Sequence, residues 1–272
     1  MDNLIDQARH PDSEIFIEAA TGVVRRGGIP VRLSPREREV AVALAVGDRP
    51  LSAREIGAML SPDTDGDEGV NLAKVYICRL RRRVTREFVV CRDGGYALAL
   101  MVGIDAVEAR RAFARLAGSR APIGCTDRVR LLGLSASLRA EPLPALAELE
   151  WFRWVSSSLR RLGHDLAMLV GRNALAHGLD AEAMHIGREL SFEDPCDEEA
   201  WELMITGHMR AGEEAAAVQG YRSYERLLAA ELQTAPSAYL REIVARCLVY
   251  DRNGTTARPI QNGLSRQRAT AP

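Results

Sequence analysis

The clearest pattern of apolar and polar positions lies in residues 70–84, VNLAKVYICRLRRRV. Four apolar side chains, Ala73, Ile77, Leu80 and Val84, recur at spacings of four, three and four residues. This spacing predicts a helix that packs along one face. The other face is polar and strongly cationic, with Asn71, Lys74, Arg79, Arg81, Arg82 and Arg83. We expect that face to meet a partner with closely spaced negative charges.

Double-stranded DNA is such a partner, because its phosphates are dense along the axis and its major groove admits one helix. An isolated basic run is more often a solvated surface, so the assignment depends on the flanking sequence. The whole chain has a net charge of −1. The cationic helix is therefore a local feature, and not the sign of a basic protein.

The flanking segments predict a defined set of elements. Short β-prone pieces within residues 14–33 indicate a small antiparallel meander. Capping boxes at Ser34–Glu37 and Ser52–Glu55 predict the starts of two helices. Residues 88–92 and 96–100 flank an Asp-Gly-Gly turn and predict a β-hairpin. A meander, three helices and a hairpin make the layout of a winged helix, whose last helix enters the major groove while the hairpin reaches an adjacent groove.

The motifs VNLAKVYICRLRRRV and VVCRDGGYAL resemble the OmpR-type winged-helix DNA-binding domain over about residues 15–100. The resemblance implies base contacts from Val75 and Arg79 and a minor-groove contact from Arg92. It implies contacts to the DNA backbone from Asn71, Leu72, Tyr76, Cys78 and Arg81. With the neighbouring cations, the expected DNA-binding residues are Asn71, Lys74, Val75, Tyr76, Cys78, Arg79, Arg81, Arg82 and Arg92.

The side-chain chemistry agrees with most of these roles. Arg79 can present two donors to guanine, and Val75 can touch a thymine methyl group. Arg81 can pair with a phosphate. Leu72 and Cys78 stand where the family often has polar groups. Asp93 directly follows Arg92 and can compete with DNA for its guanidinium.

A second stretch, LSPREREVAVALAVGDRPLSAREIGAML, resembles the start of the LuxR-type helical DNA-binding domain. That family has its recognition helix almost directly afterwards and has no wing. Here a long loop intervenes and a hairpin follows the basic helix, so the winged-helix interpretation is preferred.

The loop before the basic helix is acidic. A calcium loop of the EF-hand type beginning at Asp63 would need Gly at its sixth position and Glu at its twelfth, where Glu68 and Lys74 stand, so calcium is rejected. The OmpR-type resemblance implies that this loop can face RNA polymerase. The candidate contacts are Asp63, Asp65, Asp67 and Glu68. A plain solvated connector is the alternative.

The rest of the chain predicts amphipathic helices. Gly178 and Gly212 are 34 residues apart, as are Ala183 and Ala217, and this period is typical of tetratricopeptide repeats; an irregular helical bundle is the alternative. The stretch DPCDEEAWELMITGHMRAGEEAAAVQGYRSYERLLAAELQTAPSAYL resembles the bacterial transcriptional activation domain of SARP-type regulators.

The predicted fold is an α+β winged-helix domain followed by an all-α tetratricopeptide-like domain. The expected boundaries are an N-terminal extension at 1–14, the DNA-binding domain at 15–100, the helical domain at 101–250 and a disordered tail at 251–272. No signal peptide or membrane-length apolar run is present, which predicts a cytoplasmic protein.

Catalytic and cofactor motifs are absent from the sequence. The histidines lack metal-ligand spacing, the five cysteines form no close pair, and no phosphate-binding glycine loop occurs. We therefore expect no cofactor, no metal and no enzyme activity. Cys78 and Cys91 lie on the two DNA-facing elements, where redox control is conceivable, but an unreactive thiol is the favoured interpretation.

The combined resemblances imply a sequence-specific transcriptional activator that binds promoter repeats as a homodimer and recruits RNA polymerase. Two alternatives stay open. One is a tetratricopeptide adaptor for a protein or peptide, with a vestigial DNA-binding domain. The other is a repressor that blocks polymerase.

Overall fold

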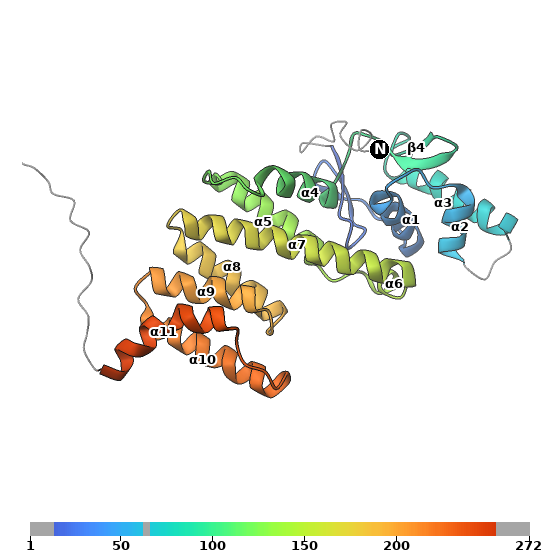
Figure 1. The fold of residues 1–272 in the computed structure, drawn as a ribbon. Helices are drawn as coiled ribbons and strands as arrows, with labels where there is room; N and C mark the ends of the chain where they lie inside the picture. Colours follow the sequence, from blue (N-terminus) through green and yellow to red (C-terminus); the bar gives the residue numbers. More distant parts are fainter. Residues whose placement is uncertain (1–13, 62–65, 254–272) are drawn as a thin grey trace, which may run out of the picture. The chain divides into compact units, whose positions relative to one another are not determined.

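The computed structural model describes residues 14–61 and 66–253 (Figure 1). The chain divides into two compact units between Ala183 and Met184, and each is described by itself. The predicted tail and N-terminal extension fall mainly on residues outside the described ones. Within the described residues, no helix is both long enough and apolar enough to cross a membrane.

The first unit contains the strands and the first seven helices among the described residues (Figure 1). In chain order its elements are β1 (Ile15–Ile17), β2 (Val24–Arg26), β3 (Ile29–Pro30), α1 (Pro35–Val46), α2 (Ala53–Leu60), α3 (Gly66–Arg83), β4 (Val89–Arg92), β5 (Gly95–Leu98), β6 (Val102–Ile104), α4 (Asp105–Leu116), α5 (Cys125–Arg139), α6 (Pro144–Ala147) and α7 (Glu150–Ala176). Helix α8 (Asp180–Glu193) crosses the boundary, and α9 (Glu198–Arg210), α10 (Glu214–Glu231) and α11 (Ala238–Asn253) follow it.

The N-terminal strands form a four-stranded sheet in the order β3-β2-β1-β6. β1 and β2 pair antiparallel, as do β2 and β3, so the predicted meander is confirmed. β6 adds a parallel pair with β1, with Ile15 opposite Val102 and Ile17 opposite Ile104. The sequence did not reveal β6, because a three-residue apolar run is too short to show a period. This strand begins after residue 100, where the sequence had predicted only helices.

The two capping boxes are formed as predicted. The Ser34 backbone N–H donates to Glu37 Oε2 over 2.7 Å, and the Ser52 backbone N–H donates to Glu55 Oε2 over 2.8 Å. In each box the serine hydroxyl accepts from the backbone N–H of the same glutamate. These bonds satisfy helix-end N–H groups and so place the starts of α1 and α2.

Helices α2 and α3 cross with almost no space between their backbones. A Cβ on Gly57 would lie 2.5 Å from the carbonyl carbon and oxygen of Gly69. Only a residue without a side chain fits there, so Gly57 sets the close approach of α3 to α2. The predicted apolar face of α3 is confirmed, since Ala73, Ile77, Leu80 and Val84 are all buried.

The hairpin is also as predicted. β4 pairs antiparallel with β5, and Arg92 lies opposite Gly95. Asp93 and Gly94 both have positive φ, 49° and 76°, which is the geometry of a type I′ turn. Tyr96 exchanges backbone hydrogen bonds of 2.7 and 2.9 Å with Leu51, which holds the hairpin against the loop between α1 and α2.

The glycines and alanines that recur 34 residues apart in the sequence also have matching local structure. Gly178 and Gly212 have nearly equal positive φ values of 76° and 77°. Ala183 and Ala217 are both fully buried. The two members of each pair, 34 residues apart, therefore occupy equivalent local environments.

The second unit has its own apolar core. Ile205, Tyr221, Tyr224, Leu240 and Val244 are among the buried side chains of α9, α10 and α11 that form it. The approach of α8 to α9 depends on another glycine, because a Cβ on Gly187 would lie 2.7 Å from the carbonyl oxygen of Ala200.

Candidate nucleic-acid interface

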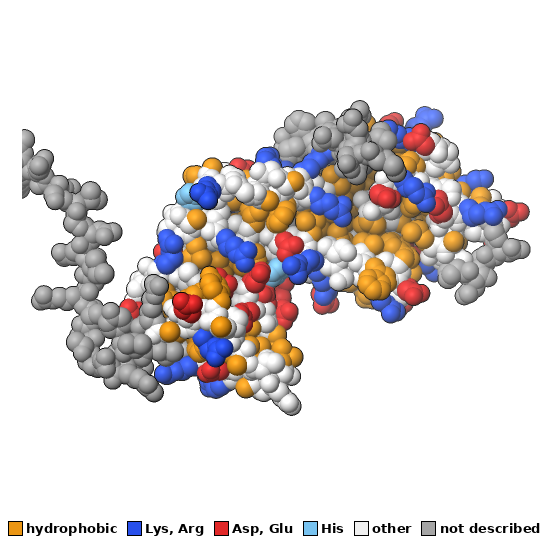
Figure 2. Space-filling model, in the orientation of Figure 1, with side chains coloured by type: hydrophobic (Ala, Val, Ile, Leu, Met, Phe, Trp, Pro, Cys, Tyr) orange, Lys and Arg blue, Asp and Glu red, His pale blue; other side chains and the backbone are white. Residues whose placement is uncertain are grey.

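Helix α3 turns its polar face to solvent, as the sequence predicted. Asn71, Lys74 and Arg82 are exposed, as are Cys78 and Arg79. Val75 lies among them with 44% of its surface exposed. Tyr76 and Arg81 are half-buried. Lys and Arg side chains can be seen over the part of the surface where Figure 1 places α3 and β4 (Figure 2).

Arg79 lies against an aromatic ring of its own helix. Its guanidinium carbon is 5.4 Å from the centroid of the Tyr76 ring. A cation–π contact restrains the guanidinium without using any of its N–H donors. Among the described residues, no hydrogen bond or ion pair engages these donors. Arg79 is therefore both positioned and available for a bidentate contact with a base.

Arg81 connects α3 to the hairpin. Its Nε–H donates to the carbonyl oxygen of Val89 over 2.8 Å, and its Nη2 lies 3.7 Å from Cys91 Sγ. Its guanidinium carbon is 5.9 Å from the centroid of the Tyr96 ring. Arg81 thus helps to hold the wing beside the helix, a role that the sequence did not indicate. Its contact with a phosphate stays a prediction.

The tip of the hairpin carries Arg92 and Asp93, which are both exposed. Their side chains form an ion pair of 3.5 Å between Nε and Oδ2. Asp93 is therefore close enough to Arg92 to compete with DNA for its guanidinium, as the sequence predicted. An exposed pair of this kind is worth at most about 1 kcal/mol, so a DNA phosphate could replace the carboxylate.

Arg83 differs from the other cations of α3, because its guanidinium is engaged in contacts with the segment before and at the start of α1. Its Nε–H donates to Glu37 Oε1 over 2.9 Å, and its Nη1 donates to the carbonyl oxygen of Arg32 over 3.3 Å. Glu37 is only 1% exposed, and its other carboxylate oxygen caps α1. Arg83 therefore ties the end of α3 to the start of α1. The sequence could not reveal this contact, because the partners are 46 residues apart.

Only part of the predicted polymerase-contact loop can be placed. Asp63 and Asp65 lie outside the described residues. Asp67 and Glu68 are exposed in the first turn of α3. Acidic side chains there interact favourably with the positive end of the helix dipole, so these two have a structural role besides any contact with a partner.

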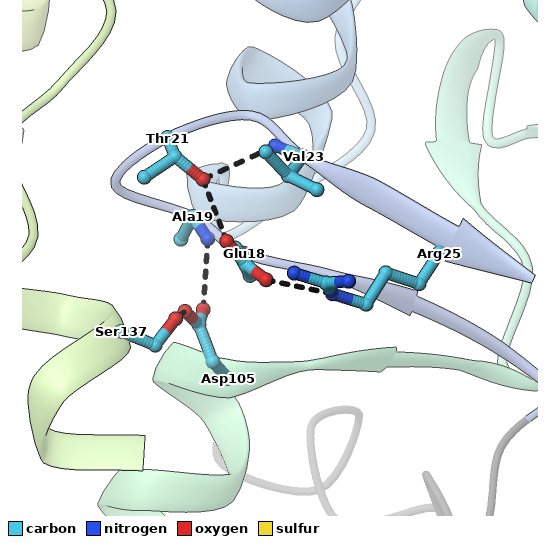
Figure 3. Close-up of polar contacts among 7 residues, drawn as sticks. All are labelled: Glu18, Ala19, Thr21, Val23, Arg25, Asp105 and Ser137. Atoms are coloured by element: carbon cyan, nitrogen blue, oxygen red, sulfur yellow. Dashed lines mark hydrogen bonds and ion pairs between the residues drawn. The ribbon is translucent and has the colours of Figure 1, made fainter. Parts of the chain in front are cut away.

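A buried carboxylate joins the N-terminal sheet to the helices that follow it (Figure 3). Asp105 Oδ1 accepts from the backbone N–H of Ala19 over 2.9 Å and from that of Ala106 over 2.7 Å. Asp105 Oδ2 accepts from the Ser137 hydroxyl over 2.6 Å. Burial raises the pKa of Asp105 to about 6, against the opposing effect of these donors. The loop after β1, the start of α4 and helix α5 therefore meet at one side chain, which the sequence analysis missed.

Neighbouring residues order the loop that supplies Ala19. Glu18 accepts from the Thr21 hydroxyl and from Arg25 Nε, each over 2.9 Å (Figure 3). Glu18 also contributes to the raised pKa of Asp105, because a second negative charge nearby disfavours ionisation.

An apolar contact joins α1 to α6 and α7. Val42 of α1 packs with Leu146 of α6 and Phe152 of α7, and all three are buried. The compact unit that holds α3 therefore includes α6 and α7, and the domain boundary at residue 100 stays a prediction. Helix α1 thus packs against α6 and α7.

Among the side chains that the structure describes, in residues 14–61 and 67–245, no group of three or more His, Cys, Asp or Glu could hold a metal ion. Cys78 and Cys91 are both exposed free thiols.

Comparison with known proteins supports this architecture. Residues 133–248 match the family described as bacterial transcriptional activator domain. The regulatory protein AfsR of Streptomyces griseus is 30% identical over 244 residues, which are 83% of this chain and 23% of AfsR. The chain thus spans less than a quarter of the length of that relative. The structure of Mycobacterium tuberculosis EmbR, solved in complex with a low-affinity phosphopeptide, has a TM-score of 0.63 at 18% identity, over 87% of this chain and 65% of EmbR.

Proposed function

Because the chain carries a bacterial transcriptional activator domain behind a winged-helix domain, the architecture of SARP-type regulators, we propose that it is a sequence-specific DNA-binding transcriptional activator. The observation that carries the proposal is the orientation of α3. Its apolar face is buried, while Val75 and Arg79 are presented to solvent.

The proposed contacts with DNA follow from this orientation. Arg79 reads a guanine through two parallel hydrogen bonds, and Val75 contacts a neighbouring thymine methyl group. Arg82, Lys74 and Asn71 contact the phosphates on either side. Arg92 enters the minor groove from the tip of the wing, after release from Asp93.

The helical domain supplies the proposed activation step. In this scheme two copies bind adjacent promoter repeats, and the helical domains support the dimer. The acidic loop before α3 contacts RNA polymerase through Asp63, Asp65, Asp67 and Glu68. Contacts worth about 1.4 kcal/mol raise promoter occupancy about tenfold, so a small polar interface is sufficient.

The first experiment selects duplexes from a random pool with the purified chain and then measures affinity for the selected duplex at two salt concentrations. With about four phosphate contacts, affinity should fall roughly a hundredfold between about 50 and about 200 mM salt. A reporter behind the selected sequence should then be induced by the chain. Failure to enrich any sequence, or affinity indifferent to salt, would favour the adaptor function. Reduced reporter output would favour repression.

A further inference from the structure

The first unit contains a second cluster of charged side chains, in a cleft between α4 and α5. The cleft has a volume of about 140 Å³. Its walls carry three guanidinium groups, from Arg111 and Arg115 of α4 and from Arg130 of α5, and its apolar lining includes Leu131 and Leu134. None of these residues lies on α3 or on the wing.

The charge of the cleft favours an anion. Three arginines face two acidic residues, Glu108 and Asp127, which leaves a net charge of +1 when all are ionised. Arg111 and Arg115 are four residues apart on α4, so they share one face of the helix. Guanidinium groups bind carboxylate and phosphate groups through paired N–H donors.

Glu108 indicates that the bound molecule also carries a hydrogen-bond donor. It lines the cleft and is only 7% exposed. Its Oε2 accepts from Arg130 Nη2 over 2.9 Å. Its Oε1 is buried and has no hydrogen-bond donor among the described residues. A buried carboxylate oxygen without a donor is costly, so a donor supplied by a bound molecule would stabilise this position.

We infer that the cleft between α4 and α5 binds a small organic anion that also carries a hydrogen-bond donor. The anionic group binds Arg111 and Arg115, and a hydroxyl or ammonium group donates to Glu108 Oε1 after a small rotation of the carboxylate. The hydrocarbon part of the molecule lies over Leu131 and Leu134. Sugar phosphates and hydroxy acids share this chemistry. A cavity of about 150 Å³ holds a molecule the size of benzene, so the ligand has few heavy atoms.

The position of the cleft gives the ligand a route to the DNA-binding elements. Helix α4 begins at Asp105, whose carboxylate bonds to Ala19 after β1 and to Ser137 of α5. A molecule that bridges α4 and α5 stabilises the arrangement that Asp105 requires. This regulatory link rests on the proposed function, and by linkage any effect of the anion on DNA affinity has an equal reciprocal effect.

The test is an NMR titration of the full chain without DNA, observing the Nε–Hε signals of arginine. Glycerol 3-phosphate probes the phosphate class, and glycerate probes the carboxylate class. At least one should give saturable shifts at Arg111, Arg115 and Arg130. Propyl phosphate lacks the hydroxyl donors and glycerol lacks the anion, so each should bind roughly tenfold more weakly or worse.

Four variants test whether the anion binds in this cleft. Combined R111Q and R115Q should abolish binding, whereas R110Q on the exposed side of α4 should preserve it. If the double variant does not fold, R115Q alone replaces it in the titration, because Arg115 is exposed. Glu108→Gln removes a negative charge from the cleft and should strengthen the binding of propyl phosphate. It should also narrow the difference in affinity between glycerol 3-phosphate and propyl phosphate, because the carboxylate that accepts from the hydroxyl group is gone.

Absence of saturable shifts with both anions would overturn the inference, as would shifts that persist in the arginine variants. Equal shifts on addition of duplex DNA alone would assign the cleft to DNA phosphates. If the anion binds but duplex affinity does not change, the regulatory link is overturned and the binding site stands. If the chain binds no duplex at all, the proposed function fails, while the titration still decides the cleft.

Discussion

Arg81 and Val89 join helix α3 to the β4–β5 hairpin through a hydrogen bond of 2.8 Å between Nε and the carbonyl oxygen. The same guanidinium lies over Tyr96 of the second hairpin strand. One side chain of α3 therefore contacts both strands of the wing, and changes to it should affect the hairpin before any DNA is present.

Arg81→Ala should loosen the wing. Loss of the bond to Val89 should lower the free energy of unfolding by about 1 kcal/mol and speed amide exchange in β4 and β5. Affinity for all duplexes should fall alike, because a displaced wing contacts no sequence well. Arg82→Ala is the control, since its exposed side chain should leave amide exchange unchanged. Equal exchange in the two variants would contradict the role of Arg81.

Arg79→Ala should relax sequence preference at one base pair. The selected duplex should lose about 1–3 kcal/mol of binding free energy, while a duplex changed at that guanine should lose far less. Fluorescence anisotropy on the two duplexes measures the difference. Arg82→Ala should weaken both duplexes equally and reduce the salt slope by about one. Equal losses on both duplexes for Arg79→Ala would rule out its base contact.

Gly57→Ala should destabilise the first unit by about 1–3 kcal/mol, because the new methyl group would overlap the backbone of Gly69. Gly133→Ala is a matched control within a helix. A Cβ there meets nothing within 4 Å, so this change should be neutral or stabilise by up to about 1 kcal/mol. Urea denaturation followed by circular dichroism measures both. A neutral Gly57→Ala would mean that α2 and α3 can separate freely.

Asp105 should make stability depend on pH. Its pKa is about 6 in the folded chain and is raised from 3.8, so the folded state binds the proton more tightly than the unfolded state. The resulting stabilisation is present below pH 4 and is lost as the pH rises through about 6. A rise in the pKa of about two units changes the free energy of unfolding by about 3 kcal/mol at most between these pH values.

The measurement compares the free energy of unfolding of wild type and Asp105→Asn between these pH values. The variant should be relatively more stable at the upper end, and the difference should shrink or reverse at the lower end. Asp105→Ala removes the acceptor for Ala19 and should destabilise at every pH. A wild type and an Asn variant with parallel profiles would contradict the raised pKa.

Local signals explain what the sequence predicted well. The apolar face of α3, the capping boxes and the Asp93-Gly94 turn each depend on residues within one element. The pairing of β1 with β6 and the hydrogen bond from Ala19 to Asp105 join residues more than 80 positions apart, and nothing local marks them. The same holds for Arg83, which looks like the other arginines of α3 until the fold places Glu37 beside it.

The place of β6 in the sheet decides where the chain can be cut. β6 covers one side of β1, so a fragment that stops at Leu100 would expose the N–H and C=O groups along that edge of an apolar strand. Such open edges recruit strands from other molecules. An N-terminal fragment that stays monomeric should therefore keep Val102–Ile104. If it also keeps Asp105, it should include enough of α4 and α5 to bury that carboxylate.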